Sequence, residues 1–207
     1  MVSNFRNLKR LIYLISPNKI YPNFYAELNK VLASKKVSFF QLRLKNKPKN
    51  QTIKIAKKIK IITQKHKVKF IINDDPKIAK KVNANGCHIG QLDDSIRLAR
   101  KDINNKIIGV TCHNSKELAL EASKNGADYL AFGSFYKSKL KPNAKKADIK
   151  ILFWAKKNIK KPIVVIGGIT DKNYKKLIKA GANYIAISSF IWNNPFLKPE
   201  IAIKKFR

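Results

Sequence analysis

Short apolar runs alternate with longer amphipathic segments along the whole chain. The runs are rich in β-branched and aromatic residues, as buried strands are, whereas the segments between them repeat apolar residues at helical spacing. This pattern predicts strands at residues 11–16, 39–44, 69–73, 86–90, 106–112, 129–133, 162–167 and 184–188. It predicts helices at residues 21–35, 50–66, 76–82, 95–102, 114–126, 148–158, 171–180 and 199–206, with a loop at 134–146.

Eight strand-then-helix units in succession predict a single (β/α)8 TIM barrel, with residues 1–207 as one domain. Strands that alternate with helices form parallel sheets through right-handed crossovers. Eight such units close a barrel, and about 200 residues is the lower end of its usual size. The alternative is an open, doubly wound sheet, which would place a glycine-rich phosphate turn after the first strand. Residues 15–18 contain no glycine, so the barrel is favoured.

The charge of the chain is strongly positive. Its formal net charge is +33, from 39 lysines and 6 arginines against 12 acidic residues. Such a balance is typical of nucleic-acid-binding proteins, but phosphate and base recognition relies on the bidentate guanidinium group of arginine. The lysines fall on the outer faces of nearly every predicted helix. We therefore expect a solvated basic surface that steers anionic substrates, and no specific nucleic-acid site.

The apolar runs are all too short for a membrane segment. None approaches the roughly 20 residues that span a bilayer, and the polar start of the chain is followed only by a short run at residues 11–15. The two cysteines, Cys87 and Cys112, have neither metal-binding nor disulfide spacing. We expect a cytoplasmic protein with no membrane association and with reduced cysteines, of unknown oligomeric state.

Four of the 12 acidic residues lie in two adjacent pairs, each after a predicted strand. These are Asp74-Asp75 and Asp93-Asp94. Because the carboxyl ends of neighbouring parallel strands meet at one end of a barrel, we expect the pairs to stand close together. Carboxylate oxygens, substrate phosphates and water are the usual ligands of Mg²⁺, so Asp74 and Asp93 are candidate metal ligands. The alternative for each pair is N-capping of the following helix.

Two further groups of residues indicate phosphate binding. Strand alternation places Gln41, Arg43 and Lys45 on one side of the second strand, which we expect to face the barrel interior because the apolar residues between them then face the helices. Cations in a barrel interior need an anion. The Gly167-Gly168 turn and Ser188-Ser189 follow the last two strands, where such barrels commonly hold phosphate on backbone N–H groups. The residues therefore imply two phosphate-bearing groups.

The chain resembles the thiamine-phosphate synthase family in an ordered set of motifs. They are Gln41-Leu42-Arg43-Leu44-Lys45, Ile72-Asn73-Asp74-Asp75, His88-Ile89-Gly90-Gln91-Leu92-Asp93, Gly109-Val110-Thr111-Cys112-His113, Gly126-Ala127-Asp128-Tyr129, Gly167-Gly168-Ile169 and Ala180-Gly181-Ala182. The resemblance extends from about residue 11 to residue 191. It implies a (β/α)8 barrel that joins a pyrimidine diphosphate to a thiazole phosphate and releases pyrophosphate.

The resemblance also implies site residues. Asp74 and Asp93 would bind Mg²⁺, and Arg43, Lys45, Lys141 and Thr111 would act in catalysis. The pyrimidine diphosphate would be held by Gln41, Arg43, Lys45, Asn73, Thr111 and Lys141, and the thiazole phosphate by Ser138, Lys139, Leu140, Gly168, Ser188 and Ser189. Leu42 and Leu44, in the first motif, would also bind substrate. The family usually has glutamate at the position of Leu44, serine at that of Thr111 and threonine at that of Leu140.

In the implied reaction, the bond to diphosphate breaks first and the thiazole nitrogen attacks the resulting pyrimidine methyl cation. Mg²⁺ and the cationic side chains would stabilise the departing anion, and no general base is needed. Consistently, the sequence offers no nucleophile with a base beside it. His113 is shared with the related thiazole tautomerases, which gives a metal-independent isomerase as an alternative; otherwise this histidine caps the fifth helix. A basic nucleic-acid-binding protein is the other alternative.

Overall fold

The strands of the computed structural model, which describes residues 10–137 and 145–207, form one closed barrel. All neighbouring strands are parallel, and β1 pairs with both β2 and β8. The strands are β1 (Ile12–Ile15), β2 (Val37–Leu42), β3 (Lys69–Asn73), β4 (Gly86–Ile89), β5 (Ile107–His113), β6 (Tyr129–Phe132), β7 (Ile163–Ile166) and β8 (Tyr184–Ile187). The predicted barrel is confirmed, and the open-sheet alternative is wrong because the first and last strands pair.

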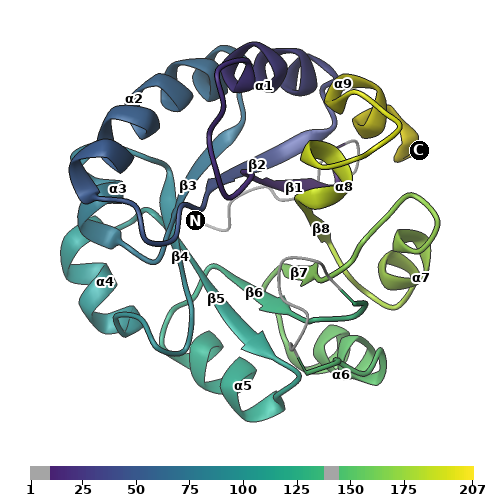
Figure 1. Ribbon diagram of the computed structural model, residues 1–207. Coiled ribbons are helices and arrows are strands. Elements are labelled where there is room, and N and C mark those ends of the chain that lie inside the picture. Colours follow the sequence, from purple (N-terminus) through teal and green to yellow (C-terminus); the bar gives the residue numbers. More distant parts are fainter. Residues whose placement is uncertain (1–9, 138–144) are drawn as a thin grey trace.

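Helices surround the strands as an outer ring (Figure 1). They are α1 (Phe24–Ala33), α2 (Lys49–Lys65), α3 (Pro76–Lys81), α4 (Ile96–Ile103), α5 (Lys116–Lys124), α6 (Lys150–Asn158), α7 (Tyr174–Lys179), α8 (Ser189–Trp192) and α9 (Pro199–Ala202), which continues into a 3₁₀ turn, Ile203–Lys205. All eight predicted helices are present, and α8 is additional. In the described part of the chain, no helix has the length and apolarity to cross a bilayer.

Strand alternation divides the buried residues into two sets. One set packs between the barrel and the helices, and includes the free, buried cysteines Cys87 and Cys112. The other set fills the barrel lumen: Tyr13, Ile15, Phe39, Ile71, Tyr129, Ala131, Val164, Tyr184 and Ala186. Large and small side chains thus share the lumen, which is a packed core and not a pore.

The same kind of turn precedes three of the strands, β4, β6 and β8. An alanine and then an asparagine or aspartate precede the strand, and the polar side chain accepts a hydrogen bond from the backbone of the strand before. These bonds join Phe70 N to Asn85 Oδ1, Ile108 N to Asp128 Oδ2, and Ile163 N to Asn183 Oδ1, each at 2.8 Å. The turn ties neighbouring strands together at their amino ends.

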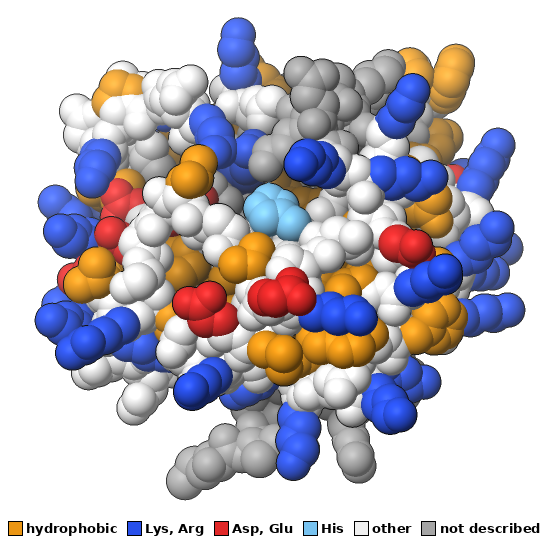
Figure 2. Space-filling view, turned by 90° about the horizontal axis from the view of Figure 1, so that it is seen from below, with side chains coloured by type: hydrophobic (Ala, Val, Ile, Leu, Met, Phe, Trp, Pro, Cys, Tyr) orange, Lys and Arg blue, Asp and Glu red, His pale blue; other side chains and the backbone are white. Residues whose placement is uncertain are grey.

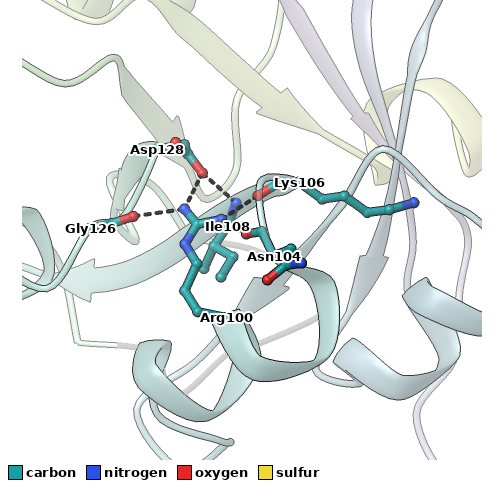
Figure 3. A network of polar contacts seen from close by, with 6 residues as sticks. All are labelled: Arg100, Asn104, Lys106, Ile108, Gly126 and Asp128. Atoms are coloured by element: carbon teal, nitrogen blue, oxygen red, sulfur yellow. Dashed lines mark hydrogen bonds and ion pairs between the residues drawn. The ribbon is translucent and has the colours of Figure 1, made fainter. Parts of the chain in front are cut away.

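At one of these turns, Arg100 of α4 adds a polar network (Figure 3). Its guanidinium group donates to the carbonyl oxygens of Asn104, Lys106 and Gly126. It also forms an ion pair of 2.6 Å with Asp128. One side chain therefore satisfies the end of α4 and the loops that lead into β5 and β6.

The lysine and arginine side chains are dispersed over the surface. Figure 2 shows them on all sides of one face of the barrel wall, with a few acidic groups between them. This face has no single basic stripe of the kind that follows a nucleic-acid backbone. The picture agrees with the diffuse basic surface that the sequence predicts.

We expect Arg100→Ala to lower the free energy of unfolding by about 2 kcal/mol, because it leaves a half-buried carboxylate and several carbonyl groups without their donor. Urea unfolding followed by circular dichroism measures this loss. Arg97→Ala, an exposed arginine on the same helix, is the matched control and should change stability little. Equal losses in the two variants would contradict the role given to this network.

Candidate active site

Two aspartates meet at the carboxyl ends of β3 and β4. Asp74 follows β3, and its N–H donates to the His88 carbonyl on β4 at 2.8 Å. Its φ of 64° lies in the left-handed region, which is uncommon for a residue other than glycine and often marks a functional site. Asp93 lies in the turn after β4, where its Oδ2 accepts the Gly90 N–H at 2.6 Å. The predicted meeting of the two acidic pairs at neighbouring strand ends is confirmed.

The pKa of Asp74 reflects the Asp93 carboxyl group beside it. Burial raises its pKa, the hydrogen bond with Asp93 and the negative charge of that residue raise it further, and the result is about 6. Lys45 and Arg43 act in the opposite direction. Asp74 therefore keeps its proton to a higher pH than an ordinary aspartate does, because a carboxylate beside it disfavours its ionisation.

This pair suits a magnesium ion. In residues 10–137 and 145–207, no group of three or more aspartate, glutamate, histidine or cysteine side chains comes together. Zinc in proteins usually has three or four such ligands. Mg²⁺ takes one or two carboxylates and keeps water and substrate phosphate as its other ligands. The two aspartates fit this second arrangement.

The second member of each acidic pair has a different role. Asp75 caps α3, accepting the Ile78 N–H at 2.8 Å, and forms an ion pair of 3.1 Å with Lys49. Asp94 is exposed, and Ser95 caps α4. Of the four aspartates, Asp75 is the one that caps a helix, so the N-capping alternative is correct for this residue alone.

Cationic side chains lie beside the aspartates at the end of β2. Lys45 Nζ is 3.8 Å from Asp74 Oδ2, and Arg43 is close enough to affect the pKa of Asp74. Gln41 is buried in the lumen, as predicted. Leu42 and Leu44 pack against the outer core, also as predicted. These two leucines can reach a substrate only through their backbone.

The remaining predicted residues on this side come from β3 and β5. Asn73 ends β3 and is half-buried, in register with His88 of β4. The Thr111 Oγ1 atom lies 2.8 Å from His88 Nε2. His88 is a lumen residue that the sequence reasoning did not assign, because a histidine in an apolar strand gave no distinct signal.

His113 is the last residue of β5 and is exposed, with φ of 52°. The cap of α5 is Ser115, whose Oγ accepts the Leu118 N–H at 3.1 Å. The interpretation of His113 as the cap is wrong.

The proposed second anion site lies at the ends of β7 and β8. Gly168 has φ of 56°, and a Cβ atom there would lie 2.3 Å from the Lys137 carbonyl oxygen, so only glycine fits. Ser188 follows β8 and precedes α8, whose first turn offers backbone N–H groups without an intrahelical partner. Ser188 Oγ donates to the Ser16 carbonyl at 3.0 Å, which holds this end of β8 against β1.

Four predicted residues lie outside the described part of the chain, namely Ser138, Lys139, Leu140 and Lys141. Their assignment stays a prediction. Ser16, which the sequence reasoning did not single out, joins the two halves of the site, since its Oγ also accepts the Arg43 N–H at 3.0 Å.

Comparisons with known proteins agree with this geometry. The family model described as thiamine monophosphate synthase matches residues 12–191. A thiamine-phosphate synthase of Pelagibacter ubique is 56% identical over 200 residues, covering 96% of this chain and 97% of that protein. The corresponding protein of Erythrobacter litoralis is 38% identical over 187 residues, 88% of each chain. A solved thiamine phosphate pyrophosphorylase from Pyrococcus furiosus has a TM-score of 0.87 at 29% identity, covering 99% of this chain and 96% of that one.

We expect Asp74→Asn to stabilise the metal-free protein at pH 7. The pKa of about 6 in the folded protein exceeds the ordinary value of 3.8, so ionised Asp74 destabilises the fold. This cost is absent below pH 4, grows as the pH rises to 6 and is fully present above it. Because the carboxylate is one-third exposed, we expect about 1 kcal/mol, or ~2–4 °C in Tm.

Thermal unfolding in EDTA at pH 4 and pH 7 tests this prediction. The variant should gain on the wild-type protein only at the higher pH. Asp94→Asn, an exposed aspartate next to Asp93, is the matched control. An equal gain at both pH values would show that the effect comes from the left-handed backbone, which asparagine tolerates, and not from charge.

Proposed function

This chain belongs to the thiamine monophosphate synthase family, and we propose from this premise that it is a transferase that makes thiamine phosphate. The substrates are 4-amino-2-methyl-5-(diphosphooxymethyl)pyrimidine and 4-methyl-5-(2-phosphoethyl)thiazole, or the carboxylate form of the thiazole. A carbon–oxygen bond to the diphosphate breaks, a carbon–nitrogen bond to the thiazole forms, and pyrophosphate leaves. With the carboxylate form, the carboxyl group also leaves as CO2.

The observation that carries this proposal is the Asp74–Asp93 pair with Lys45 beside it. Asp74 and Asp93 would hold Mg²⁺, which when bound neutralises the charge that builds on the leaving diphosphate. Arg43 and Lys45 stand at the same strand end and bind the diphosphate oxygens, with Lys141 as a further cation. Positive charge placed in advance where negative charge develops lowers the barrier to bond breaking.

The pyrimidine ring would lie in the mouth of the lumen, above Gln41 and between Asn73 and Thr111. The backbone of Leu42 and Leu44 lines the approach, because their side chains turn outward. A positioned ring keeps the reactive carbon in line with its leaving group, and the packed lumen below excludes water from the cation.

The thiazole phosphate would lie at the ends of β7 and β8, on Gly168, Ser188 and Ser189. Ser138, Lys139 and Leu140 would complete that site. The Gly168 backbone and the first turn of α8 supply N–H donors to the phosphate, and the serines supply hydroxyl groups. The thiazole nitrogen then faces the pyrimidine carbon across the barrel mouth and needs no base to attack.

A second function, isomerisation of the thiazole, is favoured by the exposed position of His113 at the end of β5. This reaction would need a proton carrier and no metal. Isomerisation that persists in EDTA and disappears in His113→Ala would support it. Formation of thiamine phosphate that depends on Mg²⁺ and persists in His113→Ala would support the synthase.

We expect Asp74→Ala and Asp93→Ala to lower kcat at least about 100-fold with the fold retained, because each removes a metal ligand at the leaving group. Pyrophosphate release from the two phosphorylated substrates and Mg²⁺ measures this loss, and circular dichroism checks the fold. Asp94→Ala is the matched control and should keep the wild-type rate. Absence of thiamine phosphate with the wild-type protein would refute the proposed function.

A further inference from the structure

A buried serine connects the ends of three strands at the barrel mouth. Ser16 is the first residue after β1 and is 2% exposed. Its hydroxyl group accepts the Arg43 N–H at 3.0 Å and donates to the Arg43 carbonyl oxygen at 3.3 Å. Its own carbonyl oxygen accepts the Ser188 hydroxyl at 3.0 Å. Because Arg43 follows β2 and Ser188 follows β8, one residue touches both proposed phosphate sites.

The Ser16 hydroxyl group takes the place of a backbone carbonyl in the ladder between β1 and β2. The Ser16 N–H donates to the Gln41 carbonyl oxygen at 2.9 Å, as in a regular parallel ladder. In the same register, the next bond would join the Arg43 N–H to the Ser16 carbonyl oxygen. The Arg43 N–H bonds instead to Ser16 Oγ, and the carbonyl oxygen accepts Ser188. A side chain therefore replaces a ladder bond at this point.

The sequence explains why the regular ladder stops after β1. The residue that follows Ser16 is Pro17, which has no N–H with which to continue the pairing to β8. The carbonyl oxygen of Ile15, the last residue of β1, also accepts a side-chain donor, Trp192 Nε1, at 2.6 Å. Side chains thus complete the hydrogen bonding of this strand end, Ser16 toward β2 and Ser188 and Trp192 toward β8.

This contact fixes the backbone of Arg43. β2 ends at Leu42, so Arg43 is the first residue of the connection to α2. One hydroxyl group nevertheless binds both its N–H and its carbonyl oxygen. The guanidinium group lies close enough to Asp74 to lower the pKa of that carboxyl group. A cation that is held in advance where a diphosphate binds needs no reorganisation when the charge develops.

We propose that Ser16 is a positioning residue for the diphosphate half of the site, where its hydroxyl group fixes the Arg43 backbone and so holds the guanidinium group beside the two aspartates. This inference rests on the proposed function, which gives the diphosphate to Arg43. Ser16 acts through Arg43 and has no contact of its own with substrate. The bond between Ser16 and Arg43 belongs to the protein alone, so it can be measured without any reaction.

Amide hydrogen exchange of the ligand-free protein, followed by NMR, tests this bond. We expect the Arg43 N–H to exchange at least about tenfold faster in Ser16→Ala, which removes its acceptor. Ser16→Thr keeps a hydroxyl group and should restore the protection. Ser38→Ala is the matched control, because Ser38 lies at the amino end of β2 and its hydroxyl group donates to the Arg10 carbonyl oxygen. Unchanged exchange of the Arg43 N–H in Ser16→Ala would overturn the proposal.

Steady-state kinetics with Mg²⁺ test the positioning role. We expect Ser16→Ala to lower kcat/KM for the pyrimidine diphosphate about tenfold, because the guanidinium group loses its fixed position. KM for the thiazole phosphate should not change, because the Ser16 carbonyl oxygen that accepts Ser188 is retained. Ser16→Thr should recover the wild-type values, and Ser38→Ala should keep them. An unchanged kcat/KM for the pyrimidine diphosphate, or an equal effect in Ser38→Ala, would overturn the proposal.

Calorimetry with inorganic pyrophosphate and Mg²⁺ separates this proposal from the proposed function. If the wild-type protein makes no thiamine phosphate, the proposed function fails. Ser16→Ala should still weaken pyrophosphate binding about tenfold if the positioning role is correct, and an unchanged affinity would overturn that role. Ser16→Cys serves if Ser16→Ala does not fold, because a thiol fills the same space but is a weak acceptor, and the same changes are expected.

Discussion

Pairing of the first strand with the last is the constraint on which the site depends. Ile12 and Leu14 of β1 lie in register with Ile185 and Ile187 of β8, which closes the sheet. Closure forces alternate residues into a narrow lumen and brings all carboxyl ends to one mouth. Ser16 strengthens this seam, since it binds Ser188 through its carbonyl oxygen and Arg43 through its hydroxyl. Residues distant in the chain are thereby held around one substrate-sized space.

The two ends of the barrel use charge in opposite ways. At the amino ends, Asp128 is matched by Arg100 and by a strand N–H, so its charge is compensated within the protein. At the carboxyl ends, Asp74 and Asp93 oppose each other, and Asp74 is held in a left-handed conformation. The first arrangement stabilises the fold. The second costs stability, and such a cost is retained where a ligand offsets it.

The fold and the meeting of Asp74 with Asp93 could be predicted because both depend on local patterns. The alternation of side chains along β2 predicted which of them face the barrel lumen. Asp74 and Asp93 follow consecutive strands, and this position predicted that they lie close together. The four-residue helix α8 was not predicted, since one turn is too short to show a hydrophobic period. The hydrogen bond between the Tyr13 and Tyr129 hydroxyl groups in the lumen was not predicted either. Tyr13 and Tyr129 belong to strands that are not neighbours, so their contact depends on tilt and register around the closed barrel.

In a chain with a strong positive charge, a pair of carboxylates at the site is itself evidence about what the site binds. Lysine alone could hold a diphosphate, and two carboxylates beside it would repel that anion. Lys45, at 3.8 Å and largely exposed, offsets only part of their charge. Asp74 and Asp93 would become part of a phosphate site if they held a divalent cation, whose charge exceeds what one lysine supplies at that point. In a chain with 12 acidic residues among 207, the meeting of two of them at one strand end supports the proposal that they hold a metal ion.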